Sequence, residues 1–161
     1  MSVTLTEMQD AIKKTAIVGV KRIYTNADAP KELFARDLPA IIPDPSKPIE
    51  SSGNQRQTLA TTVGNRWGSG WVRTRTLNYV CLVSELGADR RPSASGEKLA
   101  QLLDAVENAF CDFRMDGVHN VLSVTIGDVG ILQDAVSAAV DPARARQFHG
   151  FTAQLTVVMS Y

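Results

Sequence analysis

The stretch WVRTRTLNYVCL at residues 71–82 decides the fold. It is rich in β-branched and aromatic residues and contains neither Gly nor Pro, which is typical of a β-strand. Successive side chains of a strand point to opposite faces. In the second half of the stretch both faces are mostly apolar, whereas the first half carries Arg and Thr. This pattern predicts a strand in the middle of a small sheet whose first half runs out to solvent or to a partner.

The residues before this strand predict its hairpin partner. Residues 57–63 (QTLATTV) are polar and β-branched, and residues 64–70 (GNRWGSG) are typical of a turn. Residues 57–82 are therefore expected to form a long β-hairpin with Trp67 near its tip. Residues 46–54 (SKPIESSGN) read as a loop. We expect a hairpin or loop over about residues 44–70 to project from the compact body and to contact a partner.

Two helices are predicted on either side of this hairpin. Thr4 and Glu7 have the spacing of a capping box and begin a first helix over about residues 5–18. The second helix starts after a possible cap at Ser93 or Ser95 and ends near Phe113. Its apolar residues fall at helical spacing. They are Leu99, Leu102, Leu103, Val106 and Phe110.

Three further strands complete the prediction, at residues 40–42, 121–126 and 148–161, while residues 134–146 read as a helical turn or a loop. The order is α-β-β-α-β-β, with the hairpin adding a strand. We expect one α+β domain over residues 1–161. A mostly antiparallel sheet with two helices packed on one face is the simplest way to bury both helix stripes.

Charge is balanced overall, with 17 basic and 17 acidic residues, which argues against general nucleic-acid binding. Residues 51–91 nevertheless hold six basic and two acidic groups, and residues 92–134 hold two basic and seven acidic groups. These blocks are either complementary surfaces on neighbouring copies of the chain or solvated faces without a partner. The N-terminal residues lack the apolar region of a signal peptide, and no apolar run is long enough for a membrane span, so we expect cytoplasmic assembly.

No catalytic, cofactor or metal motif is recognisable, and the chain is predicted not to be an enzyme. His119 and His149 lack metal-ligand spacing and are expected at the surface or rim. Cys81 and Cys111 are expected to be reduced, inert thiols in apolar surroundings. The three glycines of residues 64–70 match neither a P-loop nor a dinucleotide-binding pattern, so a hairpin tip is the better reading.

One group of residues favours a protein interface, because Trp and Arg are enriched in interface hot spots. Its members are Arg66, Trp67, Trp71, Arg73 and Arg75. The alternative is that Trp71 is a core residue and the arginines are merely solvated. Arg and aromatic side chains also bind single-stranded nucleic acid, which leaves that function open.

The whole pattern resembles the tail terminator and neck (tail completion) proteins of long-tailed bacteriophages. The resemblance lies in the N-terminal helix, the motif Leu-Pro-Ala-Ile-Ile-Pro at residues 38–43, and a long loop before a strand with Tyr79 near its middle. It continues in one amphipathic helix ending in Asn108-Ala109-Phe110 and in two closing strands. It covers nearly the full chain.

The resemblance implies a non-catalytic virion protein, assembled in the host cytoplasm, that forms a homohexameric ring at the head-proximal end of the tail. Such a ring stops polymerisation of the tail tube and joins it to the head-tail connector or stopper protein, and DNA passes through its lumen without specific binding. If the basic block of one copy meets the acidic block of the next, mutating Arg73 and Arg75 together to Glu is expected to abolish the ring and leave a folded monomer. If both arginines instead face the lumen, the ring should survive. The alternatives are a small cytosolic enzyme or ligand-binding α+β domain, and a nucleic-acid-binding accessory protein.

Overall fold

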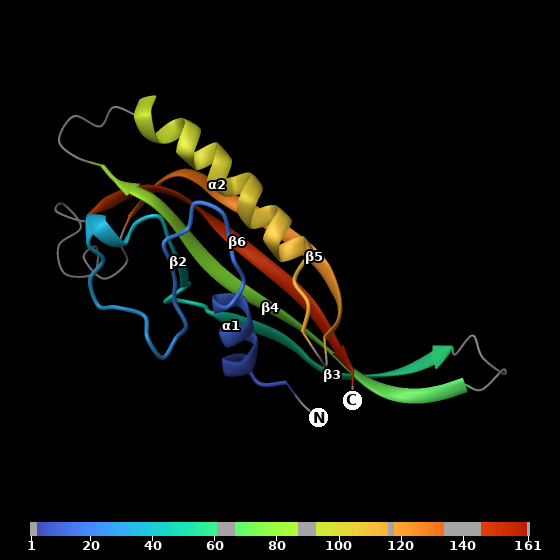
Figure 1. The fold of residues 1–161 in the computed structure, drawn as a ribbon. Helices are drawn as coiled ribbons and strands as arrows, with labels where there is room; N and C mark the ends of the chain where they lie inside the picture. The colour runs from blue at the N-terminus through green and yellow to red at the C-terminus, as the bar shows by residue number, and fades with distance from the viewer. Residues whose placement is uncertain (1–2, 61–66, 87–92, 116–117, 134–145, 161) are drawn as a thin grey trace.

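The computed structural model describes residues 3–60, 67–86, 93–115, 118–133 and 146–160, and it has two helices and a mostly antiparallel, six-stranded sheet. Figure 1 shows a long curved sheet, a helix lying along it and a two-stranded ribbon projecting from one end. The elements in order are α1 (Leu5–Lys13), β1 (Arg22–Ile23), the 3-10 turn η1 (Ala35–Asp37), β2 (Ala40–Pro43), β3 (Ile49–Ala60), β4 (Trp67–Glu85), α2 (Ser93–Cys111), β5 (Val118–Gln133) and β6 (Gln147–Ser160).

β4 is the central strand, as the sequence predicted for residues 71–82. The strand order is β1-β2-β4-β6-β5, and β3 pairs with β4 on the side that β2 also occupies further along. β6 covers the other side of β4 from Val72 to Glu85. Among the strands that the structure describes, β1 and β2 form the one parallel pair. The predicted α+β class is confirmed.

Both helices pack on one face of the sheet, also as predicted. Leu77, Tyr79, Cys81 and Val83 alternate along β4 and are fully or almost fully buried. They share one core cluster with residues of both helices and of β6. The ring of Phe110 on α2 meets that of Tyr79 edge-on, with 5.6 Å between their centroids. The other members on the helices and β6 are Met8, Ile12, Leu102, Val106, Phe151, Ala153, Leu155, Val157 and Met159.

The first helix begins as predicted but ends early. The hydroxyl of Thr4 accepts a hydrogen bond from the backbone N–H of Glu7, and the Glu7 carboxylate accepts one from the backbone N–H of Thr4. The predicted end near residue 18 is wrong, because α1 stops at Lys13. The Thr15 hydroxyl donates to the carbonyl of Ala11 beyond that end. Side chains of this kind compete with helix propagation.

The hairpin of β3 and β4 is confirmed, but two of its boundaries differ from the prediction. Residues 49–54 belong to β3, because pairing with β4 outweighs their weak strand propensity, and a bulge between Ser51 and Asn54 accommodates Gly53 at φ +75°. Residues 67–70 (WGSG) form part of β4 opposite residues 57–60 rather than a turn. The remainder of the predicted turn, residues 64–66, lies outside the described residues.

Two predictions about single residues are wrong. His149 is buried at 6% exposure rather than at the surface, since its strand β6 is flanked by β4 and β5. Cys111 is exposed, because it falls on the solvent side of the last turn of α2, whereas Cys81 is buried as expected. The side chain of His119 and residues 134–145 lie outside the described part of the chain.

Candidate functional site

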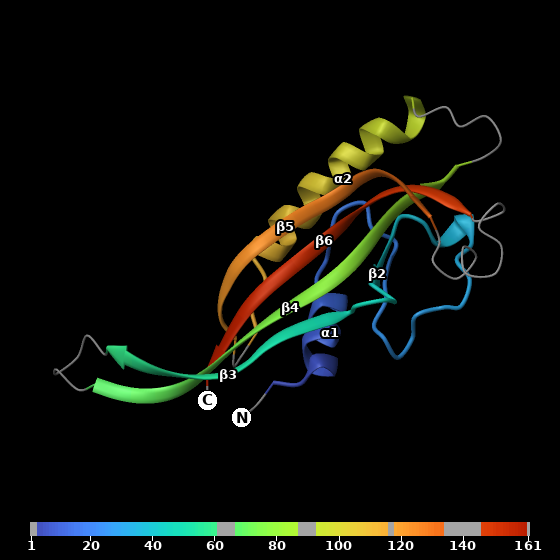
Figure 2. The same cartoon turned by 180° about the vertical axis from the view of Figure 1, so that it is seen from behind.

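The most prominent feature is the ribbon that β3 and β4 extend beyond the sheet (Figures 1 and 2). β6 ends at Ser160, opposite Val72, so within the described ranges β4 has no second partner strand from Trp67 to Trp71. We call residues 56–60 and 67–71 the arm. An isolated two-stranded ribbon is marginally stable in water. The geometry therefore favours an arm that lies against another surface.

The predicted interface residues lie along this strand rather than in one cluster. Trp67 pairs with Ala60 at the far end of the described arm, and Trp71 pairs with Arg56 nearer its root. Arg73 and Arg75 lie further in, where β4 has partners on both sides. The strand from Trp67 to Arg75 is ~27 Å long. Arg66 lies outside the described residues.

Arg75 has a role within its own chain. Its side chain is half-buried and its Nη1 donates a hydrogen bond to the backbone carbonyl of Val3 at 3.1 Å. It lies on the helix-bearing face of β4 and holds the start of the chain against the sheet. This contact is neither the predicted partner contact nor simple solvation.

The charge blocks of the sequence fall on different parts of the molecule. Residues 51–84, which span most of β3 and β4, hold four arginines and no acidic residue. Glu97, Asp104 and Asp112 are exposed on α2 and just after its end. In both views α2 lies over the side of the sheet that carries β5. The basic ribbon and the acidic helix are therefore separate surfaces of one molecule.

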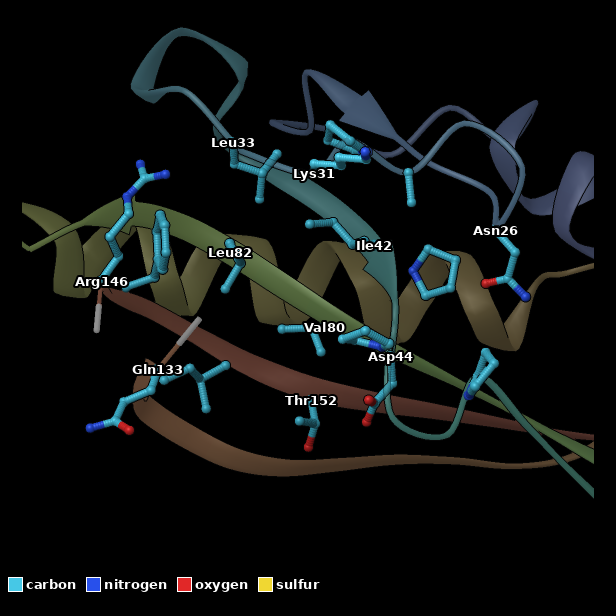
Figure 3. Close-up of a pocket in the computed structure, with 17 residues that line it drawn as sticks. Asn26, Lys31, Leu33, Ile42, Asp44, Val80, Leu82, Gln133, Arg146 and Thr152 are labelled. Carbon is cyan, nitrogen blue, oxygen red and sulfur yellow. The ribbon is translucent and has the colours of Figure 1, made fainter. Parts of the chain in front are cut away.

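A second candidate site is a cavity of about 540 Å³ on the face of the sheet opposite the helices. Figure 3 shows Val80 and Leu82 of β4 at its floor, with Leu33 and Lys31 opposite. The walls are mostly apolar, with a few polar side chains around them. The lining also includes Asn26, Pro30, Ile42, Pro43, Asp44, Pro45, Pro48, Leu132, Gln133, Arg146, Phe148 and Thr152.

An ion pair closes one end of this cavity. Nε and Nη2 of Arg146 each donate to one carboxylate oxygen of Glu85, both at 2.8 Å. The guanidinium also lies over the ring of Phe148, 5.1 Å from its centroid. The hydrogen bonds from Arg146 lower the pKa of Glu85. The pair joins the end of β4 to the residue before β6 and balances the charge of Arg146 at the cavity wall.

The segment that covers the cavity is fastened to α1. The Asp28 carboxylate accepts hydrogen bonds from the backbone N–H and hydroxyl of Thr25, and it pairs with Lys13. Partial burial opposes ionisation of Asp28, but these bonds outweigh it and lower its pKa to about 2. The backbone N–H of Asn26 donates to the side-chain oxygen of Gln9 on α1. The network fixes the loop that carries Asn26 at the cavity wall.

Two ionisable groups are buried in the core rather than placed at either site. The pKa of the Cys81 thiol and that of the Tyr79 hydroxyl are both raised by burial in the core. Among the described residues, no three His, Cys, Asp or Glu side chains gather as a metal site. The sequence reasoning did not foresee the cavity. Its available signal was the run of prolines at positions 43, 45 and 48, which exclude a helix from this segment of the cavity wall.

The chain matches no protein-family model and no curated protein sequence. Within the described ranges, neither helix has the length and apolar character needed to cross a membrane.

Proposed function

We propose that the protein is a structural component of a bacteriophage virion that assembles into a ring, with six copies, at the head-proximal end of a long tail. In this role it ends polymerisation of the tail tube and joins the tube to the head-tail connector. The observation that carries the proposal is the arm. It projects from the sheet with neither a third strand nor a helix against it among the described residues, and self-association would cover it.

Two further features support self-association. The arm belongs to a basic segment, and α2 presents exposed carboxylates elsewhere on the molecule. Two different surfaces that attract each other produce head-to-tail contacts, and such contacts generate a ring when the rotation closes. The place of the ring in a virion rests on the resemblance of residues 38–43 and of the element order to tail terminator and neck proteins.

The test is a variant without the arm. Because Gln55 and Val72 lie directly opposite one another, residues 56–71 can be replaced by Asn-Gly, which favours the tight turn of a two-residue hairpin. The buried residues of both core clusters are kept. We expect electron micrographs of the wild type to show closed rings with a central opening, and those of the variant to show only monomer-sized particles.

The matched control keeps the arm and changes the protein elsewhere. Ala16 and Ala27 are exposed on loops of the main body, and Ala16→Lys with Ala27→Lys is expected to leave the rings intact. Rings of normal size from the armless variant would contradict the proposal. A circular-dichroism melting curve for each variant separates loss of assembly from loss of folding.

The cavity supports a second candidate, a small ligand-binding domain. Its volume and mostly apolar lining with scattered polar groups are typical of small-molecule sites. Val80→Trp would fill the space above the floor. If the site binds a small apolar ligand, a thermal-shift screen should find compounds that raise the melting temperature of the wild type and not of this variant.

A further inference from the structure

We propose that neighbouring copies join through their sheets, with the outer edge of β3 on one copy pairing with the outer edge of β5 on the next. The inference rests on the proposed function only in assuming that copies of this chain associate.

The first of the two pairing edges is β5, the last strand of the sheet. It is 16 residues long and, in the described chain, pairs only with β6. Bulges interrupt its pairing with β6 on both sides of residues 123–127, which pair regularly. Leu122 beside this run is 60% exposed.

The first ten residues of β5 lack the charges and prolines that often protect a free edge. Residues 118–127 (VHNVLSVTIG) contain no Lys, Arg, Asp, Glu or Pro. Natural proteins normally use charges or prolines to protect long edge strands from pairing with other chains. The bulges limit the regular stretch to five residues, which favours one short, defined pairing over open-ended aggregation.

The second pairing edge is β3. Its 12 residues pair only with β4 in the part of the chain that the structure describes, and the pairing is regular from Asn54 to Ala60. Much of this run belongs to the arm, which reaches beyond the sheet (Figure 2). A third strand stabilises such a ribbon because each main-chain pairing satisfies donors and acceptors of both strands.

The positions of the two edges decide the kind of assembly. β3 and β5 lie on opposite sides of β4 in the strand order, separated by β4 and β6. Pairing between them therefore uses two different surfaces, and it repeats from copy to copy in one direction until the ring closes.

Charge favours this pairing over its alternatives. Residues 51–84, which span most of β3 and β4, hold four arginines and no acidic residue, so two such segments repel one another. α2 lies on the side of the sheet that carries β5 and exposes Glu97 and Asp104. A basic ribbon that approaches β5 therefore lies near acidic groups of the neighbouring copy.

Disulfide cross-linking of the full-length protein tests the pairing. Cys111→Ser removes the exposed native thiol, and Cys81 is buried. In this background Thr125→Cys on β5 is combined in turn with Cys at each position from 54 to 58 on β3. Directly opposed residues of paired strands have Cα atoms ~4.5–5.5 Å apart, within the range of a disulfide. We expect mild oxidation to give a ladder of linked oligomers for one position, weaker ladders two residues away, and none for the single-cysteine variants.

A second variant measures the same contact without cysteine. Ser123 and Thr125 are exposed on β5, so Ser123→Lys with Thr125→Lys places two charges at the edge without disturbing the core. We expect self-association to weaken by at least about tenfold, whereas Ala16→Lys with Ala27→Lys, which adds the same charge elsewhere, leaves it unchanged.

The outcomes separate this inference from the proposed function. Wild-type oligomers that no cysteine pair cross-links, and that the two lysines on β5 do not weaken, would overturn the edge pairing and leave the ring intact. A wild-type protein that stays monomeric at every concentration and gives no cross-linked ladder would overturn both.

Discussion

The guanidinium of Arg75 is held within the subunit. It donates to the carbonyl of Val3, and its Nε is buried without a hydrogen-bond partner in the described chain. When a buried polar group already lacks one hydrogen-bond partner, losing another lowers the stability of the fold further. Loss of assembly after changing Arg73 and Arg75 together would therefore mix an interface effect with a folding effect.

We predict that Arg75→Glu alone destabilises the monomer. The substitution places a carboxylate beside a backbone carbonyl and removes the donor to Val3, which should cost ~2–3 kcal/mol of unfolding free energy. Urea denaturation of the wild type, Arg75→Glu and Arg75→Gln measures this cost. Glu should be the worse of the two, and equal midpoints for all three proteins would contradict the assigned contact.

At the scale of an element, Asp28 fastens the loop over residues 25–28 to α1. Its pKa of about 2 in the folded protein lies below its ordinary value of 3.8. A carboxylate with a lowered folded-state pKa contributes stability above its unfolded pKa, and this contribution declines as the pH falls through the folded value. The loop at the cavity wall is therefore held less firmly in acid.

We predict that Asp28→Asn makes stability less dependent on pH between about pH 5 and pH 2. The gap in thermal midpoint between wild type and variant should be largest near neutral pH and should close in acid. Asp10→Asn removes an exposed carboxylate from α1 and controls for the change in net charge. A gap of constant size across this range would show that ionised Asp28 does not hold the loop.

The elements differ in how far sequence alone predicts them. The central strand, the capping box of α1, the apolar stripe of α2 and the alternation in β6 each have a periodic or local signal, and the structure confirms them. β3 begins at Ile49, although Ser51, Ser52 and Gly53 are poor strand formers. Its pairing with β4 is a tertiary effect that local propensity does not contain.

The candidate sites were harder to predict than the fold. The projecting hairpin has a local sequence signal, so its existence could be predicted. The intrachain contact of Arg75 joins residues 72 positions apart, and the cavity is built from several separate segments of the chain. Neither the Arg75 contact nor the cavity produces a residue-spacing pattern that can be recognised in a single sequence. The free edges of β3 and β5 became visible only with the strand order.

At the scale of the whole molecule, one end of the sheet carries the basic ribbon, and the β5 edge on another side lies near the acidic helix α2. In the proposed ring these two surfaces meet between neighbouring copies. Attraction between charges near a surface is screened by salt, with a Debye length of ~10 Å at 0.1 M and ~3 Å at 1 M. Hydrogen bonds between strand edges are less sensitive to salt. High salt should therefore weaken the assembly but leave the pairing between strands in place.

The mass of the wild-type protein in solution tests the central claim most directly. Light scattering behind a sizing column, at low and high salt and over a range of concentrations, gives this mass without labels or variants. We predict a closed oligomer of about six times the 17.5 kDa subunit, with some dissociation at high salt. A particle of 17.5 kDa at every salt and protein concentration would contradict self-assembly through the arm and the sheet edges.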